Sequence, residues 1–267
     1  MNLSRVGAIV LRLMYLYRSS PQRVFPIFVW VVVDILLWGF LTRYLNAVSR
    51  AEFNFVPALL GAALLWDFLT RVMQGVTMPI FEDVWSRNFL NFFATPLRTS
   101  EYLVGLVAAA VVTSSLSLIT MFAFAELAFG LSFFTFGVAL APFLMVLFLT
   151  GIALGVTASA VILRLGPASE WLIWPIPMLM SPFAGVFYPV AILPGWMQAI
   201  AMVLPPSHVF EGMRAIVAGK PAPWDRLMLG GGLALIYLVL ACLFFFDVYR
   251  TVIRNGLIAR YSAETVV

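Results

Sequence analysis

Long apolar runs separated by short polar stretches make up most of the chain. Six of these runs are long and continuous enough to cross a bilayer as helices, and they lack the short alternating pattern of barrel strands. The predicted spans are residues 24–41, 55–78, 102–129, 133–163, 170–187 and 227–246. We therefore predict an all-α integral membrane protein with six transmembrane helices, organised as one domain over residues 1–267.

A basic segment precedes the first predicted span. Residues 1–23 carry four arginines and no acidic residue, with apolar side chains between them at roughly helical spacing. This pattern predicts an amphipathic helix on the membrane surface. A signal peptide is disfavoured, because arginines interrupt the apolar core and no small-residue cleavage pattern follows. The bundle then covers residues 24–246, and residues 247–267 form a tail on the same side.

A polar stretch, PIFEDVWSRNFLNFFATPLRTSE, separates the second span from the third at residues 79–101. Its apolar and aromatic side chains recur at steps of three and four, which predicts a short helix with one apolar face. Pro79 can begin such a helix and Pro96 can end it. We predict a helix lying flat on the membrane surface. An ordinary loop helix tucked under the bundle is the alternative.

The segment between the fifth and sixth spans, residues 188–225, contains a nine-residue apolar run at 196–204. A run of this length is too short to span, so we predict a broken interfacial or re-entrant hairpin. Glu211 and Arg214 are spaced to form an ion pair on a helix. The hairpin is either an outer gate or a cap that seals the bundle.

The first two predicted spans contain three charged residues. Asp67 and Arg71 are four residues apart and are expected to neutralise each other. Asp34 has no local partner, and it could reach Arg71, lie at a subunit interface or line a path. In the fourth span, Gly151, Gly155 and Ser159 form a stripe of small residues, which permits close helix packing within the chain or between two copies.

Composition excludes several classes of protein. The chain is 63% hydrophobic and only 10% charged, against about 25% charged residues in soluble domains. One cysteine and one histidine exclude an intrachain disulfide and the common metal clusters. Gly219 and Lys220 lack the spacing of a phosphate loop, so the chain has no nucleotide-binding motif. We therefore expect no enzyme activity, no metal and no cofactor in this chain.

The placement of positive charge predicts orientation. The outer segments carry only five of the 16 Lys and Arg residues, namely Arg43, Arg50, Arg214, Lys220 and Arg226. The excess on the other side places both termini in the cytoplasm. The net charge of +4 therefore reflects membrane topology and does not indicate nucleic-acid binding.

Three stretches together resemble a known family. They are RSSPQRVFPIFVWVVVDILLWGFLTRYL, FEDVWSRNFLNFFATPLRTSEYLVG and FYPVAILPGWMQAIAMVLPPSHVFEGMRAI. In this order they resemble the permease subunit of ABC-type exporters of the type-2 superfamily, which export polysaccharides, drugs and lipids. The resemblance implies a bacterial inner-membrane exporter of an amphipathic lipid, drug or saccharide-linked substrate. It also implies a homodimer bound to two cytoplasmic ABC ATPase subunits, which carry the ATP and Mg.

The resemblance assigns roles to three groups of residues. The helix at residues 81–93 would be the coupling helix seated on the ATPase, with the N-terminal helix as an interface helix beside it. The hairpin at residues 193–218 would close the outer end. The implied coupling residues are Phe81, Glu82, Asp83, Trp85, Arg87, Asn88, Pro96 and Leu97. The implied interface-helix residues are Arg5, Arg12 and Arg18, and the implied gate residues are Pro194, Trp196, Pro205, Pro206, Glu211 and Arg214.

Two other functions are alternatives to an exporter permease. A proton- or ion-coupled secondary transporter would use Asp34 and Asp67, but the inverted repeats typical of that class are not visible between the two halves. A membrane-embedded enzyme would need a polar catalytic cluster. Ser207 and His208 are neighbours in sequence, which is not the geometry of a catalytic triad.

Overall fold

The structure is a computed structural model, and it describes residues 1–48, 56–86, 88, 91–92 and 95–256. Within these ranges every regular element is helical. The long helices are α1 (Leu3–Ser19), α2 (Pro21–Val48), α3 (Gly61–Trp85), α4 (Thr99–Phe129), α5 (Leu140–Leu165) and α9 (Trp224–Arg254). The shorter helices are α6 (Pro175–Ala184), α7 (Gly195–Val203) and α8 (Pro205–Val217), with single-turn segments at Val56–Leu60, Phe133–Ala139, Pro167–Leu172 and Val190–Ile192.

Five helices of the described chain are long and apolar enough to cross a membrane, one fewer than the predicted six. They are Pro21–Val48, Val56–Trp85, Thr99–Phe129, Phe136–Leu165 and Trp224–Arg254. The predicted fifth span, residues 170–187, is not one helix. Its place is taken by a short 3-10 segment and the ten-residue α6, both of which begin at a proline. Proline favours a helix start and breaks a helix interior, which explains the division into pieces too short to span.

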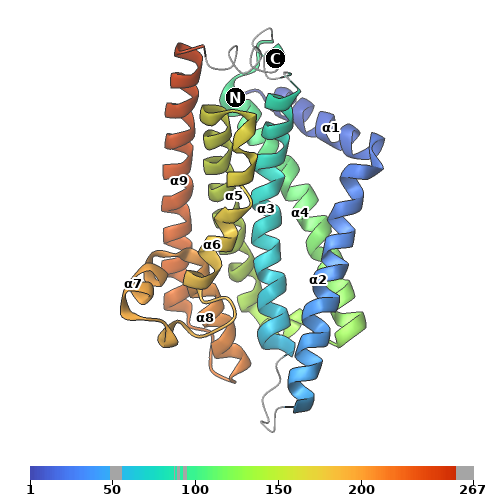
Figure 1. The fold of residues 1–267 in the computed structure, drawn as a ribbon, viewed down its shortest axis with the longest axis vertical. Helices are drawn as coiled ribbons and strands as arrows, with labels where there is room; N and C mark the ends of the chain where they lie inside the picture. Colours follow the sequence, from blue (N-terminus) through green and yellow to red (C-terminus); the bar gives the residue numbers. More distant parts are fainter. Residues whose placement is uncertain (49–55, 87, 89–90, 93–94, 257–267) are drawn as a thin grey trace.

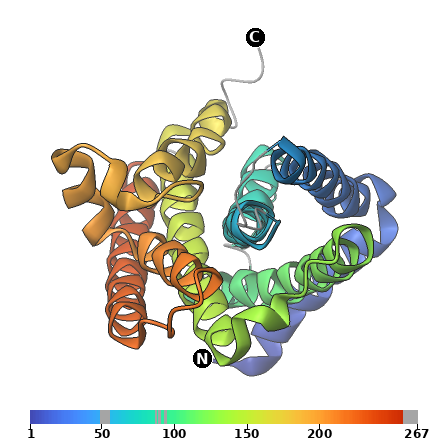
Figure 2. The ribbon, with the colours of Figure 1, turned by 90° about the horizontal axis from the view of Figure 1, so that it is seen from below.

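Helix α5 lies at the centre of the packing, with α3 on one side and α9 on the other. Helix α4 joins α3 to α2, so that α2 and α9 lie at opposite flanks (Figure 1). The view along the bundle in Figure 2 shows the same order. Helix α1 crosses one end of the bundle, where α9 also finishes, and α7 and α8 lie toward the other end.

Close packing of α3 against α5 depends on two glycines. The hydrogen at Gly151 and at Gly155 faces the α3 backbone, and a Cβ added at Gly155 would lie 2.7 Å from the Met73 carbonyl oxygen. Thr77 uses this proximity to donate a hydrogen bond of 3.2 Å to the Gly155 carbonyl. The small-residue stripe therefore serves packing within the chain, which was one of the two predicted uses.

The predicted surface helix beginning at Pro79 is wrong as a separate element. Pro79 lies inside α3, which continues to Trp85 before a turn at Ser86. Helix α3 lacks one backbone hydrogen bond at Pro79, because proline has no N–H to donate to the carbonyl four residues earlier. The apolar spacing was real, but it continues the buried face of α3, where Ile80 is fully buried.

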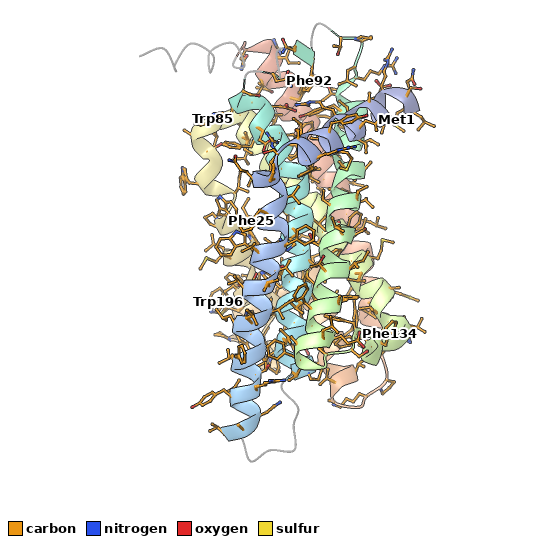
Figure 3. All side chains as sticks on the ribbon, turned by 90° about the vertical axis from the view of Figure 1, so that its right-hand side faces the viewer. Met1, Phe25, Trp85, Phe92, Phe134 and Trp196 are labelled. Carbon is orange, nitrogen blue, oxygen red and sulfur yellow. The ribbon has the colours of Figure 1, made fainter. Side chains whose placement is uncertain are left out.

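Apolar side chains cover the outside of the bundle along its length, as Figure 3 shows. Phe25 on α2 and Phe134 beside α5 are examples with well-exposed rings. Such surfaces are expected where hydrocarbon or another helix covers the protein. Trp85 and Phe92 lie near the α1 end of the molecule, and Trp196 lies farther toward the α7 end.

Candidate functional site

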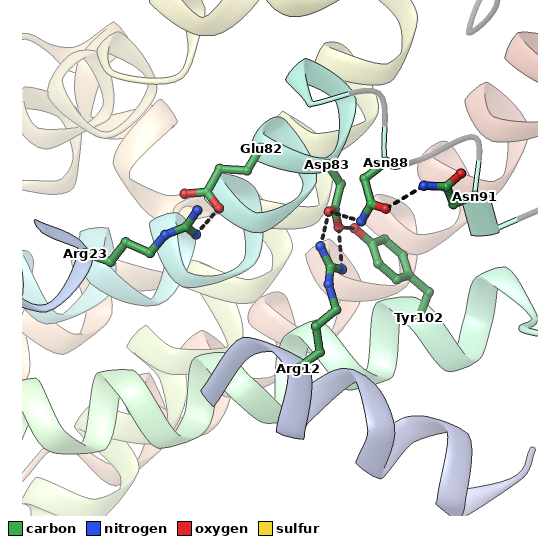
Figure 4. Close-up of polar contacts among 7 residues, drawn as sticks. All are labelled: Arg12, Arg23, Glu82, Asp83, Asn88, Asn91 and Tyr102. Atoms are coloured by element: carbon green, nitrogen blue, oxygen red, sulfur yellow. Dashed lines mark hydrogen bonds and ion pairs between the residues drawn. The ribbon is translucent and has the colours of Figure 1, made fainter. Parts of the chain in front are cut away.

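Four polar side chains meet where α1 crosses the ends of α3 and α4, and we call them the Asp83 cluster: Arg12, Asp83, Asn88 and Tyr102 (Figure 4). Both guanidinium NH2 groups of Arg12 donate to the two Asp83 oxygens, one of them at 2.9 Å. Tyr102 donates its hydroxyl to Asp83 at 2.8 Å, and Asn88 donates its amide at 3.1 Å. One carboxylate therefore joins α1, α3, α4 and the loop after α3.

The Asp83 side chain is only 2% exposed, so its charge depends on these four donors rather than on water. The hydrogen bonds that Arg12 donates to Asp83 raise the pKa of Arg12 above its ordinary value, against the lowering effect of burial. The Arg12 guanidinium also lies 5.4 Å from the centre of the Phe92 ring. Asp83 was predicted to contact an ATPase, but its burial makes it a residue that holds α1 in place.

Four further contacts tie α1 and the start of α2 to the same region. The Asn2 backbone N–H donates to Glu101 on α4 at 2.7 Å, and Arg5 lies 3.4 Å from the same carboxylate. Arg5 also donates to the Pro96 carbonyl oxygen. At the start of α2, Arg23 forms an ion pair with Glu82. The N-terminal segment is thus fastened to both sides of the loop between α3 and α4.

The surface next to the Asp83 cluster remains open. Trp85 is 67% exposed, and the side chain of Glu82 is 42% exposed. Ser86, Pro96 and Arg18 are exposed as well, whereas Phe81, Asn88 and Leu97 are partly covered. Arg87 lies outside the described residues. The predicted coupling residues therefore divide into exposed side chains that a partner can touch and the buried Asp83.

A cavity of about 630 Å³, which we call the inner cavity, lies between α1, α2, α3 and α4. It begins beside Arg23 and Glu82 and extends to Asp34 and Asp67. Asp34 lies about 16 Å from Arg23 along the axis of α2, which is roughly half the thickness of a bilayer core. Its other lining residues are Leu13, Leu16, Tyr17, Gln22, Trp30, Arg71, Gln74, Gly75, Met78, Pro79, Thr113, Ser114, Ser117 and Trp174.

The three acidic residues of the inner cavity differ in their partners. Asp67 pairs with Arg71 at 2.6 Å, which confirms the predicted ion pair. Glu82 pairs with Arg23. Asp34 forms no hydrogen bond or ion pair with any side chain that the structure describes, and it lies on the cavity wall. Asp34 lies on the cavity wall and within electrostatic range of Arg71, and its role stays a prediction.

The opposite end of the molecule carries the broken hairpin. Pro194 precedes α7, and Pro205 and Pro206 begin α8, so the prolines divide the segment as expected. Glu211 accepts hydrogen bonds at 2.8 Å from Arg214 and from the Val190 backbone, which confirms the predicted pair. Ser207 and His208 contact the carbonyl oxygens of Ala201 and Met202. Their role is to fasten α8 to α7, and Trp196 stays exposed.

Several residues of these sites were not singled out in the sequence. Tyr102 and Glu101 are partners of α1, and Trp30 and Trp174 line the inner cavity. The signal for Glu101 was its place in the first turn of α4, where an acid favours the helix dipole. No local pattern could have paired Tyr102 with Asp83, because their contact depends on how α3 and α4 pack.

Comparison with known proteins gives one match. A family model described as "ABC-2 family transporter protein" matches residues 45–247. A search of curated proteins finds no significant match. The matched range begins in α2 and ends in α9, so it includes the Asp83 cluster apart from Arg12, most of the inner cavity and the hairpin.

Proposed function

The chain belongs to the ABC-2 family of transporter proteins, and from this premise we propose that it is the permease of an ATP-driven exporter. It would move an amphipathic substrate outward across the bacterial inner membrane, with both termini in the cytoplasm. Membership makes the chain a membrane transport component that generally works with an ABC ATPase partner. The sequence contains no nucleotide-binding motif, so ATP and Mg would bind to two copies of that partner.

The Asp83 cluster is the observation that carries this proposal. A partner bound to the exposed Trp85 and Ser86 would sit beside a carboxylate that holds α1, α3 and α4 together. A displacement of this loop would therefore reach three helices at once, since α3 carries Asp83 and α1 and α4 each donate a hydrogen bond to it. This arrangement supports the assignment of residues 81–97 to ATPase coupling and of α1 to a neighbouring interface helix.

A second permease copy completes the proposed assembly. Helices α2 and α9 bury little of their surface within the chain, compared with α3 and α5. Their exposed apolar faces are suited to lipid and to a second copy of the same chain. The hairpin of α7 and α8 lies at the end away from the Asp83 cluster, which supports its assignment as the outer gate. The ion-coupled alternative has no support from the family match.

A cysteine crosslink tests the coupling surface. In a Cys242→Ser background, Ser86→Cys is co-expressed with an ABC ATPase encoded beside the permease, which carries reporter cysteines in its permease-facing groove. We expect a specific crosslink whose yield changes when ATP is added, because the exposed Ser86 follows the last turn of α3. Lys220→Cys, which follows α8 at the opposite end, is the matched control and should give no crosslink.

One outcome of the crosslinking experiment would reject the proposal that the chain is the permease of an ATP-driven exporter. The ATPase would fail to copurify with a folded permease, and Ser86→Cys would crosslink no better than Lys220→Cys. Copurification with equal crosslinking from both positions would instead place the ATPase contact elsewhere and remove residues 81–97 from that role.

A further inference from the structure

The inner cavity contains a carboxylate, Asp34, that forms no ion pair with any residue that the structure describes. Its described lining includes three carboxylates, Asp34, Asp67 and Glu82, and two guanidinium groups, Arg23 and Arg71. Both guanidiniums have an acidic partner, since Arg71 pairs with Asp67 and Arg23 with Glu82. The lining therefore carries one excess negative charge, and it is located at Asp34.

Such a charge is costly where Asp34 lies. The residue is on α2, about 16 Å along the helix from Arg23 and thus near the middle of a bilayer core. A carboxylate at this depth is stabilised when a cation or several hydrogen-bond donors face it. Among the described side chains, none donates a hydrogen bond to Asp34 or forms an ion pair with it. The charge of Arg71 acts on Asp34 from a distance, but Arg71 is itself paired with Asp67. Asp34 lies on the wall of a cavity of about 630 Å³. Cavities of roughly 300–1,000 Å³ hold drug-sized ligands.

Aromatic rings flank the same position. Trp30 lies four residues before Asp34, on the same face of α2, and Trp174 approaches from the segment before α6. Both indoles are more than half exposed. The faces of tryptophan rings attract cations, and most strongly where water is partly excluded. Leu13, Leu16 and Met78 supply apolar surface nearer to α1, which suits a hydrocarbon or aromatic body.

We propose that the inner cavity binds an organic cation with a hydrophobic body, and that Asp34 is the counterion of its positive charge. This inference rests on the proposed function and specifies the substrate class of the exporter. The cation would lie between Trp30, Trp174 and Asp34, while its apolar part contacts the leucines of α1. An anionic headgroup is disfavoured, because it would face Asp34 without an available guanidinium.

Equilibrium binding to the purified permease tests whether the inner cavity binds an organic cation beside Asp34. The probe is radiolabelled tetraphenylphosphonium, and the uncharged triphenylphosphine oxide, which carries similar aromatic groups, is the competitor. We expect Asp34→Asn to raise the Kd of the cation at least about tenfold, because charge pairs in a partly buried site are screened less than exposed pairs. Asp34→Glu should largely retain binding. Glu126→Gln, an exposed acid on α4, is the matched control and should bind like the parent protein.

An equal Kd in the parent and Asp34→Asn proteins would overturn the inference. So would displacement of the probe by sodium or by triphenylphosphine oxide as readily as by unlabelled tetraphenylphosphonium. If Asp34→Asn does not fold, the charge preference of the parent protein and the loss of affinity in Trp30→Leu decide the question. The measurement needs no ATPase, so its failure alongside an ATP-sensitive Ser86 crosslink would reject the substrate class and leave the proposed function intact.

Discussion

Two neighbouring acidic residues near the end of α3, Glu82 and Asp83, have different roles because their surroundings differ. Asp83 is buried and accepts four hydrogen bonds, from one residue on each of two other helices and from a loop residue. Glu82 is largely exposed and contacts Arg23 alone among the side chains described. Their chemistry is nearly the same, so the free energy that each contributes depends on burial and on the number of donors.

Substitution of each acidic residue by its amide should distinguish the contributions of Asp83 and Glu82 to the free energy of unfolding. Asp83→Asn keeps the shape but removes the charge from Arg12, and we expect a loss of about 1.5–3 kcal/mol in the free energy of unfolding, the range for hydrogen bonds to charged groups. Glu82→Gln should cost less than about 1 kcal/mol, as exposed pairs usually do. Unfolding in mixed micelles with increasing dodecyl sulfate measures both. Equal losses would contradict the central role of Asp83.

The ion pairs that were predicted from sequence are local, and those that were missed are not. Asp67 with Arg71 and Glu211 with Arg214 lie within one helical turn, so helix geometry alone brings them together. Arg12 and Asp83 are 71 residues apart. Their contact exists only because α1 folds back across the end of the bundle. Asp34 was recognised as unusual from its depth, but the aromatic cavity beside it required the packing of four helices.

At the scale of elements, glycine and proline determine where helices approach and where they end. The apolar pattern predicted every long helix of the described chain, because bilayer-length hydrophobic runs are a strong signal. It did not predict the ends of α2 and α9, which extend beyond the apolar cores to Val48 and Arg254. It also separated the end of α3 from the rest of that helix wrongly, since Pro79 is tolerated inside a helix whose neighbours are closely packed.

A methyl group at Gly155 should disturb the central helix pair. In Gly155→Ala the new carbon would meet the Met73 carbonyl oxygen at 2.7 Å, so α3 and α5 must separate. We expect destabilisation by about 1–3 kcal/mol, the usual cost of overpacking. Gly232→Ala on α9 is the control, because no atom lies within 4 Å of its added carbon. A thermal unfolding assay in detergent should show a lower Tm only for Gly155→Ala; equal behaviour of both variants would argue against close packing here.

At the scale of the molecule, α1 and the last turn of α9 lie at one end and the α7–α8 hairpin toward the other. The excess of arginine near α1 predicts that this end faces the cytoplasm. Five of the six predicted spans correspond to helices long and apolar enough to cross a membrane. The predicted fifth span is divided into short helical pieces, whose prolines were visible in the sequence but whose division could not be located without the packing around them.

Thiol labelling in intact cells measures this orientation. In a Cys242→Ser background, we expect Lys220→Cys to react with a membrane-impermeant maleimide added outside. Ser4→Cys and Thr251→Cys, both at exposed positions near the α1 end, should react only after the membrane is permeabilised. The pattern follows from the charge distribution. Labelling of Ser4→Cys from outside would invert the topology and with it the direction of transport.

Pro79 lies beside both the inner cavity and the Asp83 cluster, and this position can couple the two. It belongs to the wall of the inner cavity, and it lies one turn before Asp83. Because the backbone bond is missing there, α3 bends most easily at Pro79, and such a hinge would be shared by the proposed ligand site and the proposed partner site. If a bound cation changes the angle of this hinge, the affinity of the permease for the ATPase must change by some factor. Thermodynamic reciprocity then requires the ATPase to change the affinity for the cation by the same factor.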